Sequence, residues 1–252
     1  MKPNYVTVIG QGYVGLPLSI RIAEKGNICF GLDSSQELIT DLKKRNLRNY
    51  DLNTIKKLTS LIDNRSYLPT TDYKVILDSQ VILICLPTPL TPVGKPDLKI
   101  LNKSLKEIKK VAKPQTLIIL ESTVNPGLTR SLEKLFPKCD IAFSPERIDP
   151  LNQKWDVKNT PKLVAGLTDK ARDRAVEFYS KFIDTVIPCS SLEVAETAKL
   201  LENSFRLINI SFINELAIFC NKMGIDVQEV IKAASTKPYG FMPFYQIGRA
   251  HV

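Results

Sequence analysis

Three glycines at G-x-G-x-x-G spacing, between a β-rich segment and a helical one, constrain this chain more than any other feature. Gly10, Gly12 and Gly15 join the β-rich run 5–9 to the helical run 14–25. The first glycine of such a turn bends the chain, the second lets the backbone approach a pyrophosphate, and the third lets helix and strand pack closely. The helix N-terminus then favours an anion. The segment predicts a dinucleotide-binding βαβ unit.

An acidic residue follows the second β-rich run of this unit. Asp33 comes after run 28–32, 18 residues beyond Gly15. A carboxylate there accepts hydrogen bonds from both ribose hydroxyls and repels a 2′-phosphate, so we expect NAD rather than NADP. The alternative is a glycine turn that binds no ligand.

Helix-like and strand-like segments alternate through the first 189 residues. Helices are predicted over 35–45, 51–62, 98–111, 128–136 and 169–182, and strands over 81–85, 116–120, 140–143, 162–165 and 185–187. Parallel strands need helical crossovers of this length, so the alternation predicts an α/β fold with a doubly wound, parallel, Rossmann-type sheet.

The pattern then changes to one long helix. From Ser190 or Ser191, either of which is a plausible N-cap, apolar residues recur at helical spacing until Gly224. One small sheet cannot cover such a helix, so we expect it to join two bodies or to pair with a second copy. A capping box beginning at Asp226 predicts a short helix through Ala234.

Polar, proline-containing loops follow three of the predicted strands. They are Cys-Leu-Pro-Thr-Pro-Leu at 85–90, Glu-Ser-Thr-Val-Asn-Pro-Gly at 121–127 and Phe-Ser-Pro-Glu-Arg at 143–147. Each loop alone contains ordinary turn residues. Ligands of open α/β sheets bind beyond the carboxyl ends of the strands, so we expect the three loops to converge on the nicotinamide.

The long helix carries a polar stripe. Glu196, Lys199, Asn203 and Arg206 are spaced by three, four and three residues, which places them on one face, and Ile210 continues it. One interpretation is a solvated polar face. The other is that Lys199 and Asn203 present a cation and an amide to one reacting oxygen.

Composition limits the partners and the location. Lys and Arg number 35 against 26 Asp and Glu, and the net charge of +9 favours anionic partners such as nucleotides. No apolar window reaches the ~20 residues of a membrane span, and the N-terminus lacks a signal peptide's apolar core. The 5 cysteines contain no C-x-x-C pair, and His251 is the single histidine. We expect a cytoplasmic protein with no metal, no membrane association and no nucleic-acid partner.

Taken together, these motifs resemble the nucleotide-sugar 6-dehydrogenases, the UDP-glucose/GDP-mannose dehydrogenase family. The resemblance covers about residues 4–245, with the motifs in family order: the glycine turn 10–18, the three loops, Ala-Glu-x-x-Lys-Leu-x-Glu-Asn at 195–203 and Asn-Glu at 214–215. Segments 143–150 and 236–245 are most similar to the bacterial UDP-N-acetylglucosamine and UDP-N-acetylmannosamine 6-dehydrogenases. The Ser-Pro-Glu-Arg loop and the Thr-Lys-Pro-x-Gly-Phe segment argue against a 3-hydroxyacid or 6-phosphogluconate dehydrogenase.

The resemblance implies an NAD-dependent oxidation of a UDP-sugar C6 alcohol to a carboxylate, through an aldehyde and a cysteine thioester, for acidic surface polysaccharide. It implies that Thr123 positions a water and contacts the cofactor, that Glu146 transfers protons, and that Lys199 and Asn203 stabilise oxyanions. The cofactor residues it implies are Gly10, Gln11, Gly12, Tyr13, Val14, Gly15, Asp33, Pro87, Thr88 and Thr123. The substrate residues it implies are Glu146, Arg147, Lys199, Asn203 and Arg206. The helix over 191–223 resembles the family's dimerisation helix, which implies a homodimer or a higher homo-oligomer.

Several positions depart from the family pattern. Leu151 stands where the family usually has Gly, on the loop that carries Glu146; Leu128 replaces a usual Thr, and Ala165 replaces the first Gly of a pair. The family's nucleophilic Cys, expected just after the position of Tyr245, is missing. Two alternatives therefore stay open: a UDP-glucose 6-dehydrogenase, or a non-catalytic fragment or pseudoenzyme that binds NAD and dimerises.

The family pattern stops before Gln246. Residues 246–252, Gln-Ile-Gly-Arg-Ala-His-Val, are the translation of a common sequencing-library adapter, AGATCGGAAGAGCACACGTCTGA, preceded by one base and ending in its stop codon. We therefore expect an NAD-binding domain over 1–189, a central helical domain over 190–245, a non-native tail over 246–252, and no UDP-sugar-binding domain.

Overall fold

The computed structural model describes residues 4–46, 51–147 and 154–245. The predictions for Leu151, His251 and the tail 246–252 fall outside these residues. The chain forms two compact units, residues 1–199 and 200–252. Each is described in turn.

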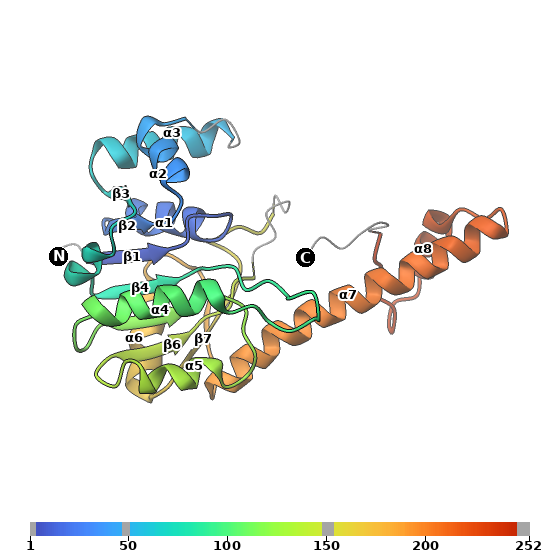
Figure 1. Cartoon of the computed structure of the whole chain (residues 1–252). Helices are drawn as coiled ribbons and strands as arrows, with labels where there is room; N and C mark the ends of the chain where they lie inside the picture. Colours follow the sequence, from blue (N-terminus) through green and yellow to red (C-terminus); the bar gives the residue numbers. More distant parts are fainter. Residues whose placement is uncertain (1–3, 47–50, 148–153, 246–252) are drawn as a thin grey trace. The chain divides into compact units, whose positions relative to one another are not determined.

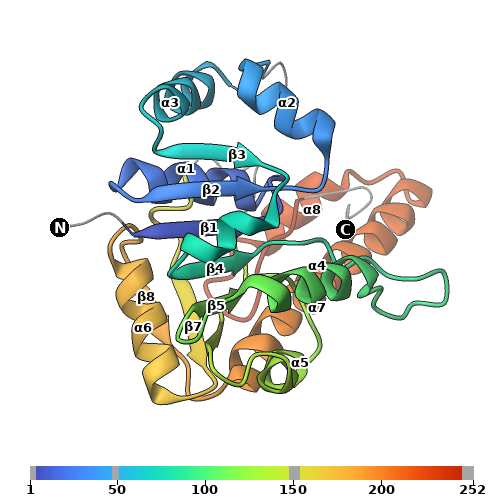
Figure 2. The ribbon, with the colours of Figure 1, turned by 60° about the vertical axis from the view of Figure 1, so that its left-hand side comes forward.

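The first unit is built on a sheet of eight strands. Their order is β3-β2-β1-β4-β5-β6-β7-β8, and Figure 2 shows it from β3 through β5. The strands are β1 (Tyr5–Ile9), β2 (Ile28–Leu32), β3 (Tyr67–Thr70), β4 (Val81–Ile84), β5 (Leu117–Leu120), β6 (Asp140–Phe143), β7 (Lys162–Gly166) and β8 (Val186–Pro188). The order runs outward from β1 in both directions, as in a doubly wound fold. The predicted α/β class is therefore confirmed.

The sheet is not parallel throughout. β7 runs antiparallel to β6, with Phe143 opposite Ala165, whereas all other neighbouring strands are parallel. A parallel connection needs a crossover of a dozen or more residues, usually a helix. The described residues between β6 and β7 contain no helix. The prediction of a parallel sheet is therefore corrected at β7, while the other strand pairs agree with it.

Helices cover both faces of the sheet (Figure 1). Those of the first unit are α1 (Gly15–Glu24), α2 (Gln36–Lys44), α3 (Leu52–Asp63), α4 (Lys99–Val111), α5 (Leu128–Ser131) and α6 (Asp169–Ser180), with 3-10 turns η1 (Tyr73–Asp78) and η2 (Leu132–Lys134). One apolar cluster joins alternate strand residues to α1, α2, α3 and α6, and the other joins the intervening residues to η1, α4 and η2. Strands buried on both faces explain the nearly continuous apolar runs in the sequence.

Most predicted elements exist, with ends shifted by one or two residues. Two elements, β3 and η1, are not predicted by the sequence pattern, because they are short and lie among turn residues. The predicted helix 128–136 is divided into α5 and η2. Pro137 disfavours helical backbone at Phe136, so the segment does not continue as a longer helix.

The long helix is α7 (Leu192–Lys222), which begins in the first unit and continues into the second. Gly224, at φ +69°, ends it in a left-handed conformation. In the second unit it is followed by α8 (Val227–Ala234), whose first turn is capped by the Asp226 carboxylate, which accepts from the Gln228 amide at 2.9 Å. Over the described ranges, no helix combines the length and apolarity needed to cross a membrane.

Candidate functional site

The glycine turn directly follows β1, and two of its glycines are required by close packing. A Cβ at Gly10, whose φ is +91°, would lie 2.5 Å from the Cys85 carbonyl oxygen. A Cβ at Gly15 would lie 1.8 Å from the Gly10 carbonyl oxygen. A Cβ at Gly12 would meet nothing within 4 Å. The turn is therefore tightly packed at Gly10 and Gly15 and open at Gly12. This arrangement lets a pyrophosphate approach the backbone at Gly12.

Asp33 is held at this turn by backbone amides. Its Oδ2 accepts from the Gln11 amide at 2.7 Å, and its Oδ1 accepts from the Ser35 amide at 2.9 Å. Each carboxylate oxygen can accept a further hydrogen bond. The half-buried carboxylate is thus fixed next to the turn with acceptor capacity for two ribose hydroxyls.

The other residues of the turn that are predicted to contact the cofactor differ in their exposure. Gln11 is buried and faces the protein: its Nε2 donates to the Val8 carbonyl at 2.9 Å, and its Oε1 accepts from the Tyr67 hydroxyl at 2.7 Å. The buried side chain of Gln11 therefore anchors the turn to β1 and β3 through these hydrogen bonds. Tyr13 is 76% exposed and Val14 is half-buried, so both are available to a ligand.

The loops after β4 and β5 are bonded to each other. The Thr88 hydroxyl donates to the Thr123 carbonyl at 2.6 Å, and the Leu86 amide donates to the Ser122 hydroxyl at 3.0 Å. Pro87 is exposed between these contacts. Since β1 and β4 are neighbours at the point where strand order reverses, this pair of loops lies beside the glycine turn, where a ligand of such a sheet binds.

A buried ion pair connects the third loop to the second. The Lys162 ammonium donates to Glu121 Oε2 at 2.5 Å and to the Pro145 carbonyl at 3.5 Å, and the Tyr179 hydroxyl donates to Glu121 Oε1 at 2.5 Å. Burial acts against the ammonium, but the attraction of the Glu121 and Glu146 carboxylates and the hydrogen bond to Glu121 together outweigh it and raise the pKa of Lys162 above its usual value. Glu121 begins the second loop and Pro145 precedes Glu146, so the pair fixes both loops.

Glu146 and Arg147 lie beside this ion pair. Glu146 Oε1 accepts from the Arg147 amide at 2.6 Å, and the Arg147 guanidinium donates to the Pro161 carbonyl at 2.9 Å. Both residues, with Lys162, line a small cavity. The structure thus brings the three predicted loops together, from Thr88 and Thr123 to the Glu146 segment.

The polar stripe of α7 is not one solvated face. Glu196 is fully buried and accepts from the Gly127 amide at 2.6 Å and the Thr129 amide at 3.0 Å. Lys199, one turn later, is half-buried in the first unit. Asn203, half-buried, and Arg206, exposed, belong to the second unit.

Sequence reasoning gave no role to Glu121, Lys162 or Tyr179. Glu121 lies in the polar loop 121–127, which the sequence analysis describes. Lys162 stands first in a predicted strand, where a charged residue is ordinarily solvated. Tyr179 falls within an unremarkable helical pattern. Only the packing of β5, β7 and α6 shows that the three groups meet.

The departures from the family pattern fit the apolar core. Ala165 is fully buried, and Leu128 packs against the same cluster. Gly166, which follows Ala165, cannot be replaced by a larger residue without a shift, because a Cβ there would lie 2.2 Å from the Arg172 amide nitrogen.

The cysteines are free thiols. Burial raises the pKa of Cys29 to about 12 and that of Cys85 well above its usual value. Burial also raises the pKa of Cys139 and Cys189. None of these four is an ionised nucleophile at neutral pH. The described residues contain no group of three or more His, Cys, Asp or Glu placed to hold a metal.

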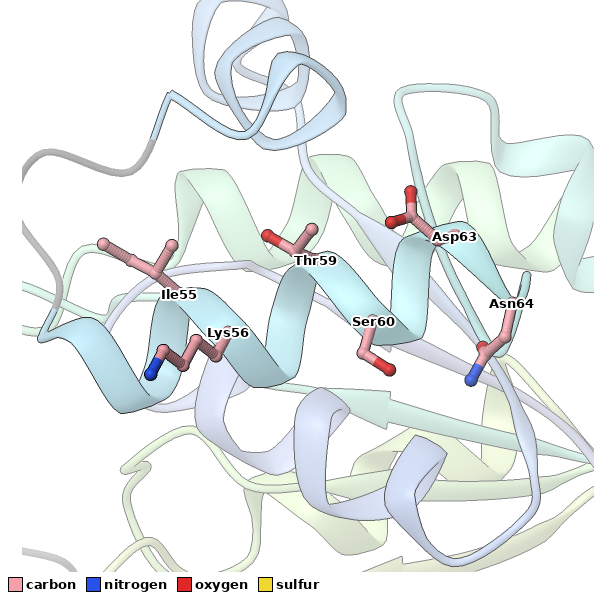
Figure 3. A pocket seen from close by; sticks show the side chains of 6 residues that line it. All are labelled: Ile55, Lys56, Thr59, Ser60, Asp63 and Asn64. Atoms are coloured by element: carbon pink, nitrogen blue, oxygen red, sulfur yellow. The ribbon is translucent and has the colours of Figure 1, made fainter.

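A separate hollow lies on α3 (Figure 3). Its lining residues are Ile55, Lys56, Thr59, Ser60, Asp63 and Asn64. All come from α3 and its C-terminal cap, and none from a loop at the carboxyl ends of the strands. This hollow is a surface depression along one helix and does not contribute to the candidate site.

Comparisons with known proteins agree with this geometry. Residues 4–183 match the NAD binding domain of the UDP-glucose/GDP-mannose dehydrogenase family, and residues 193–249 match its central domain. The chain is 37% identical over 257 residues to a UDP-N-acetyl-D-glucosamine 6-dehydrogenase of Pseudomonas aeruginosa, covering 97% of this chain and 59% of that protein. It is 34% identical over 252 residues to protein CapL of Staphylococcus aureus, covering 95% and 57%.

Solved structures show the same similarity. The structure of a UDP-D-ManNAc dehydrogenase from Pyrococcus horikoshii superposes with a TM-score of 0.87 at 29% identity, covering 94% of this chain and 58% of that one. The chain therefore spans less than two thirds of the length of these relatives.

Proposed function

Because the chain belongs to the UDP-glucose/GDP-mannose dehydrogenase family, we propose that it supplies the NAD-binding and central-helix part of an enzyme that oxidises the C6 alcohol of a UDP-sugar to a uronate. We favour UDP-N-acetylglucosamine or UDP-N-acetylmannosamine, since similar curated proteins carry those names. UDP-glucose is the alternative. The product would serve acidic surface polysaccharide, and the enzyme would work in the cytoplasm.

The observation that carries the proposal is the convergence of the glycine turn, Asp33 and three strand-end loops at one edge of the sheet. When bound, NAD supplies the hydride acceptor. The turn would hold the pyrophosphate, Asp33 would hold the ribose, and the bonded pair Thr88 and Thr123 would line the nicotinamide end.

The oxidation has two stages, and the chain's own groups suit different parts of it. Alcohol, water and two NAD⁺ give carboxylate, two NADH and protons. In this proposal Thr123 orients the water and Glu146 moves a proton. Lys199 and Asn203 stabilise the oxyanionic states, and Lys199 also transfers a proton. We assign Arg147 and Arg206 to substrate binding, since guanidinium groups suit phosphate oxygens.

We expect this 252-residue chain to bind NAD without turning over sugar, and the full-length gene product to turn over. The support is the state of the thiols: burial keeps Cys29 and Cys85 protonated. A non-catalytic, NAD-binding protein is the second candidate, and this observation favours it for the chain taken alone.

We also propose a homodimer or higher homo-oligomer through the helix over 191–223. In the second unit, large apolar side chains of α7 are exposed: Leu201 by 67%, Ile208 by 67% and Phe212 by 61%. A contiguous apolar surface of this kind is typical of a protein interface.

The test has two arms. Calorimetric titration of NAD into the 252-residue chain should give saturable binding. The full-length gene product should release two NADH per molecule of UDP-N-acetylhexosamine, followed by absorbance. Turnover with UDP-glucose alone would select the alternative substrate. NAD binding without any turnover would select the non-catalytic candidate, and no NAD binding would contradict both.

A further inference from the structure

Glu196 is a buried carboxylate whose hydrogen bonds go to the backbone. Its side chain is fully buried, and its two oxygens accept from the Gly127 amide at 2.6 Å and the Thr129 amide at 3.0 Å. A buried carboxylate is costly unless hydrogen bonds satisfy it. These two bonds therefore hold the N-terminal part of α7 against Gly127, which ends the loop 121–127, and against α5.

The two ends of this contact each carry a residue with a proposed role in the reaction. Thr123 lies in the loop whose last residue, Gly127, donates to Glu196. Lys199 lies three residues after Glu196 on α7, on the same face of the helix. Glu196 thus stands between the loop of Thr123 and the helical turn of Lys199.

Apolar packing reinforces the same connection. Val124, next to Thr123, belongs to one buried cluster with Leu192 and Ala195 of the first turn of α7. A displacement of α7 against the loop would therefore disturb both the packing and the hydrogen bonds.

We propose that Glu196 is the positioning residue that fixes Thr123 and Lys199 relative to each other for the reaction. It acts through the backbone of Gly127 and Thr129 and does not touch the substrate. This inference rests on the proposed function of Thr123 and Lys199.

The neighbouring acid provides a matched control. Glu193 lies one turn earlier on α7, and its carboxylate accepts from the Arg130 guanidinium at 2.6 and 3.1 Å. It connects the same helix to the same segment, but both side chains are more than a third exposed. Such surface pairs contribute little to a fixed geometry.

The experiment compares Glu196→Gln with Glu193→Gln in the full-length gene product. Glutamine keeps the shape and one acceptor oxygen but turns an NH₂ group toward the second backbone amide. We expect Glu196→Gln to lower kcat about tenfold or more, because small displacements of reacting groups cost that much. The KM for the UDP-sugar and the positions of the limbs of the pH profile should stay near wild type. Glu193→Gln should leave kcat within about twofold, as a surface pair does.

Three readouts separate positioning from other roles. Circular dichroism confirms that each variant folds. A loss of thermal stability with unchanged kcat would show a merely structural bond and overturn the inference. A shifted limb of the pH profile would show that Glu196 itself exchanges protons in the reaction, which also overturns it.

Failure of the proposed function is distinguishable. If the wild-type full-length protein does not turn over, that function is wrong, and the NAD titration of the 252-residue chain then decides whether Glu196 holds the loop that carries Thr123. Glu196→Gln should then weaken NAD binding about threefold, since Thr123 adjoins the cofactor site and 0.65 kcal/mol or so corresponds to that factor. Hydrogen exchange should rise over 121–129 in this variant only. Unchanged NAD affinity would overturn the inference.

Discussion

The two units of the chain differ in how completely they cover their own apolar surface. In the first unit, strand residues such as Val8 and Ile119 are fully buried, and helices pack on both faces of the sheet. In the second unit, Ile208 and Phe212 of α7 are more than 60% exposed. A sheet with helices on both faces encloses its core, whereas two helices bury only a stripe. The first unit encloses its own core, and the second leaves large apolar side chains of α7 exposed, which is the surface we propose for the oligomer.

The two units also differ in how many polar and charged side chains they bury. Among the described residues, every buried polar or charged side chain belongs to the first unit, with Glu196 the last along the chain. Buried polar groups must be paired, so they specify one arrangement of the loops that carry Thr123 and Glu146. The second unit has no such constraint, and its contacts depend on apolar fit.

Lys162→Met should have the largest effect, and it should fall on the first unit. It leaves the Glu121 carboxylate buried without its cation, which costs about 3–5 kcal/mol of unfolding free energy. Urea unfolding followed by circular dichroism measures this loss. The matched control is Lys170→Met, which removes an exposed ammonium from Asp140 while Asp140 keeps its pair with Arg174; it should cost ~1 kcal/mol or less. Equal losses of unfolding free energy in the two variants would show that the buried pair contributes no more to stability than the exposed one.

Phe212→Glu should act on the second unit and on assembly rather than on the fold of the first. Removing one large apolar side chain from an interface costs about 1.5–3 kcal/mol, roughly ten- to a hundredfold in the dimer dissociation constant. Sedimentation at several concentrations measures it, with Lys222→Gln as the control on the same helix. A strictly monomeric wild-type protein would remove the oligomer proposal.

Asp33→Ser should change cofactor choice with less effect on stability. Without the carboxylate, NADP is no longer repelled, and the preference for NAD should fall about tenfold, or 1.4 kcal/mol. Titration of both cofactors into the 252-residue chain measures it. Because Asp33 also accepts from the Gln11 and Ser35 amides, Asp33→Asn is the control that keeps an acceptor. Equal wild-type affinity for NAD and NADP would contradict the role of Asp33.

The smallest effect should come from Glu193, near the start of α7 in the first unit. Hydrogen bonds from Arg130 lower the pKa of Glu193 from 4.5 to about 2. A lowered pKa in the folded state means that the stabilisation is present above the unfolded pKa and is lost as the pH falls toward the folded one. The stability difference between wild type and Glu193→Gln should therefore shrink as the pH falls from about 5 to about 2. A difference that grows on acidification would contradict this assignment. Its size at neutral pH should be a small fraction of the Lys162 effect, because the pair is exposed.

The sequence by itself determined the α/β class, the long helix and the glycine turn with Asp33, because local periodicity and backbone requirements leave their mark on neighbouring residues. Gly10 has no room for a Cβ beside the Cys85 carbonyl, and Gly15 has none beside the Gly10 carbonyl. The sequence pattern also placed Thr88, Thr123 and Glu146 on strand-end loops, since it predicts where each strand ends.

Only the tertiary structure decided the reversal of β7, the meeting of Glu121, Lys162 and Tyr179, and the burial of Glu196. These depend on which strands become neighbours and on which helix reaches which loop. Such contacts join residues as far apart as Gly127 and Glu196, and a local pattern carries no signal of them. The helical spacing put Glu196 on the same polar stripe as Lys199, but only packing against the loop made it a buried acceptor of backbone hydrogen bonds, because burial is set by what lies opposite a residue and not by the residues beside it.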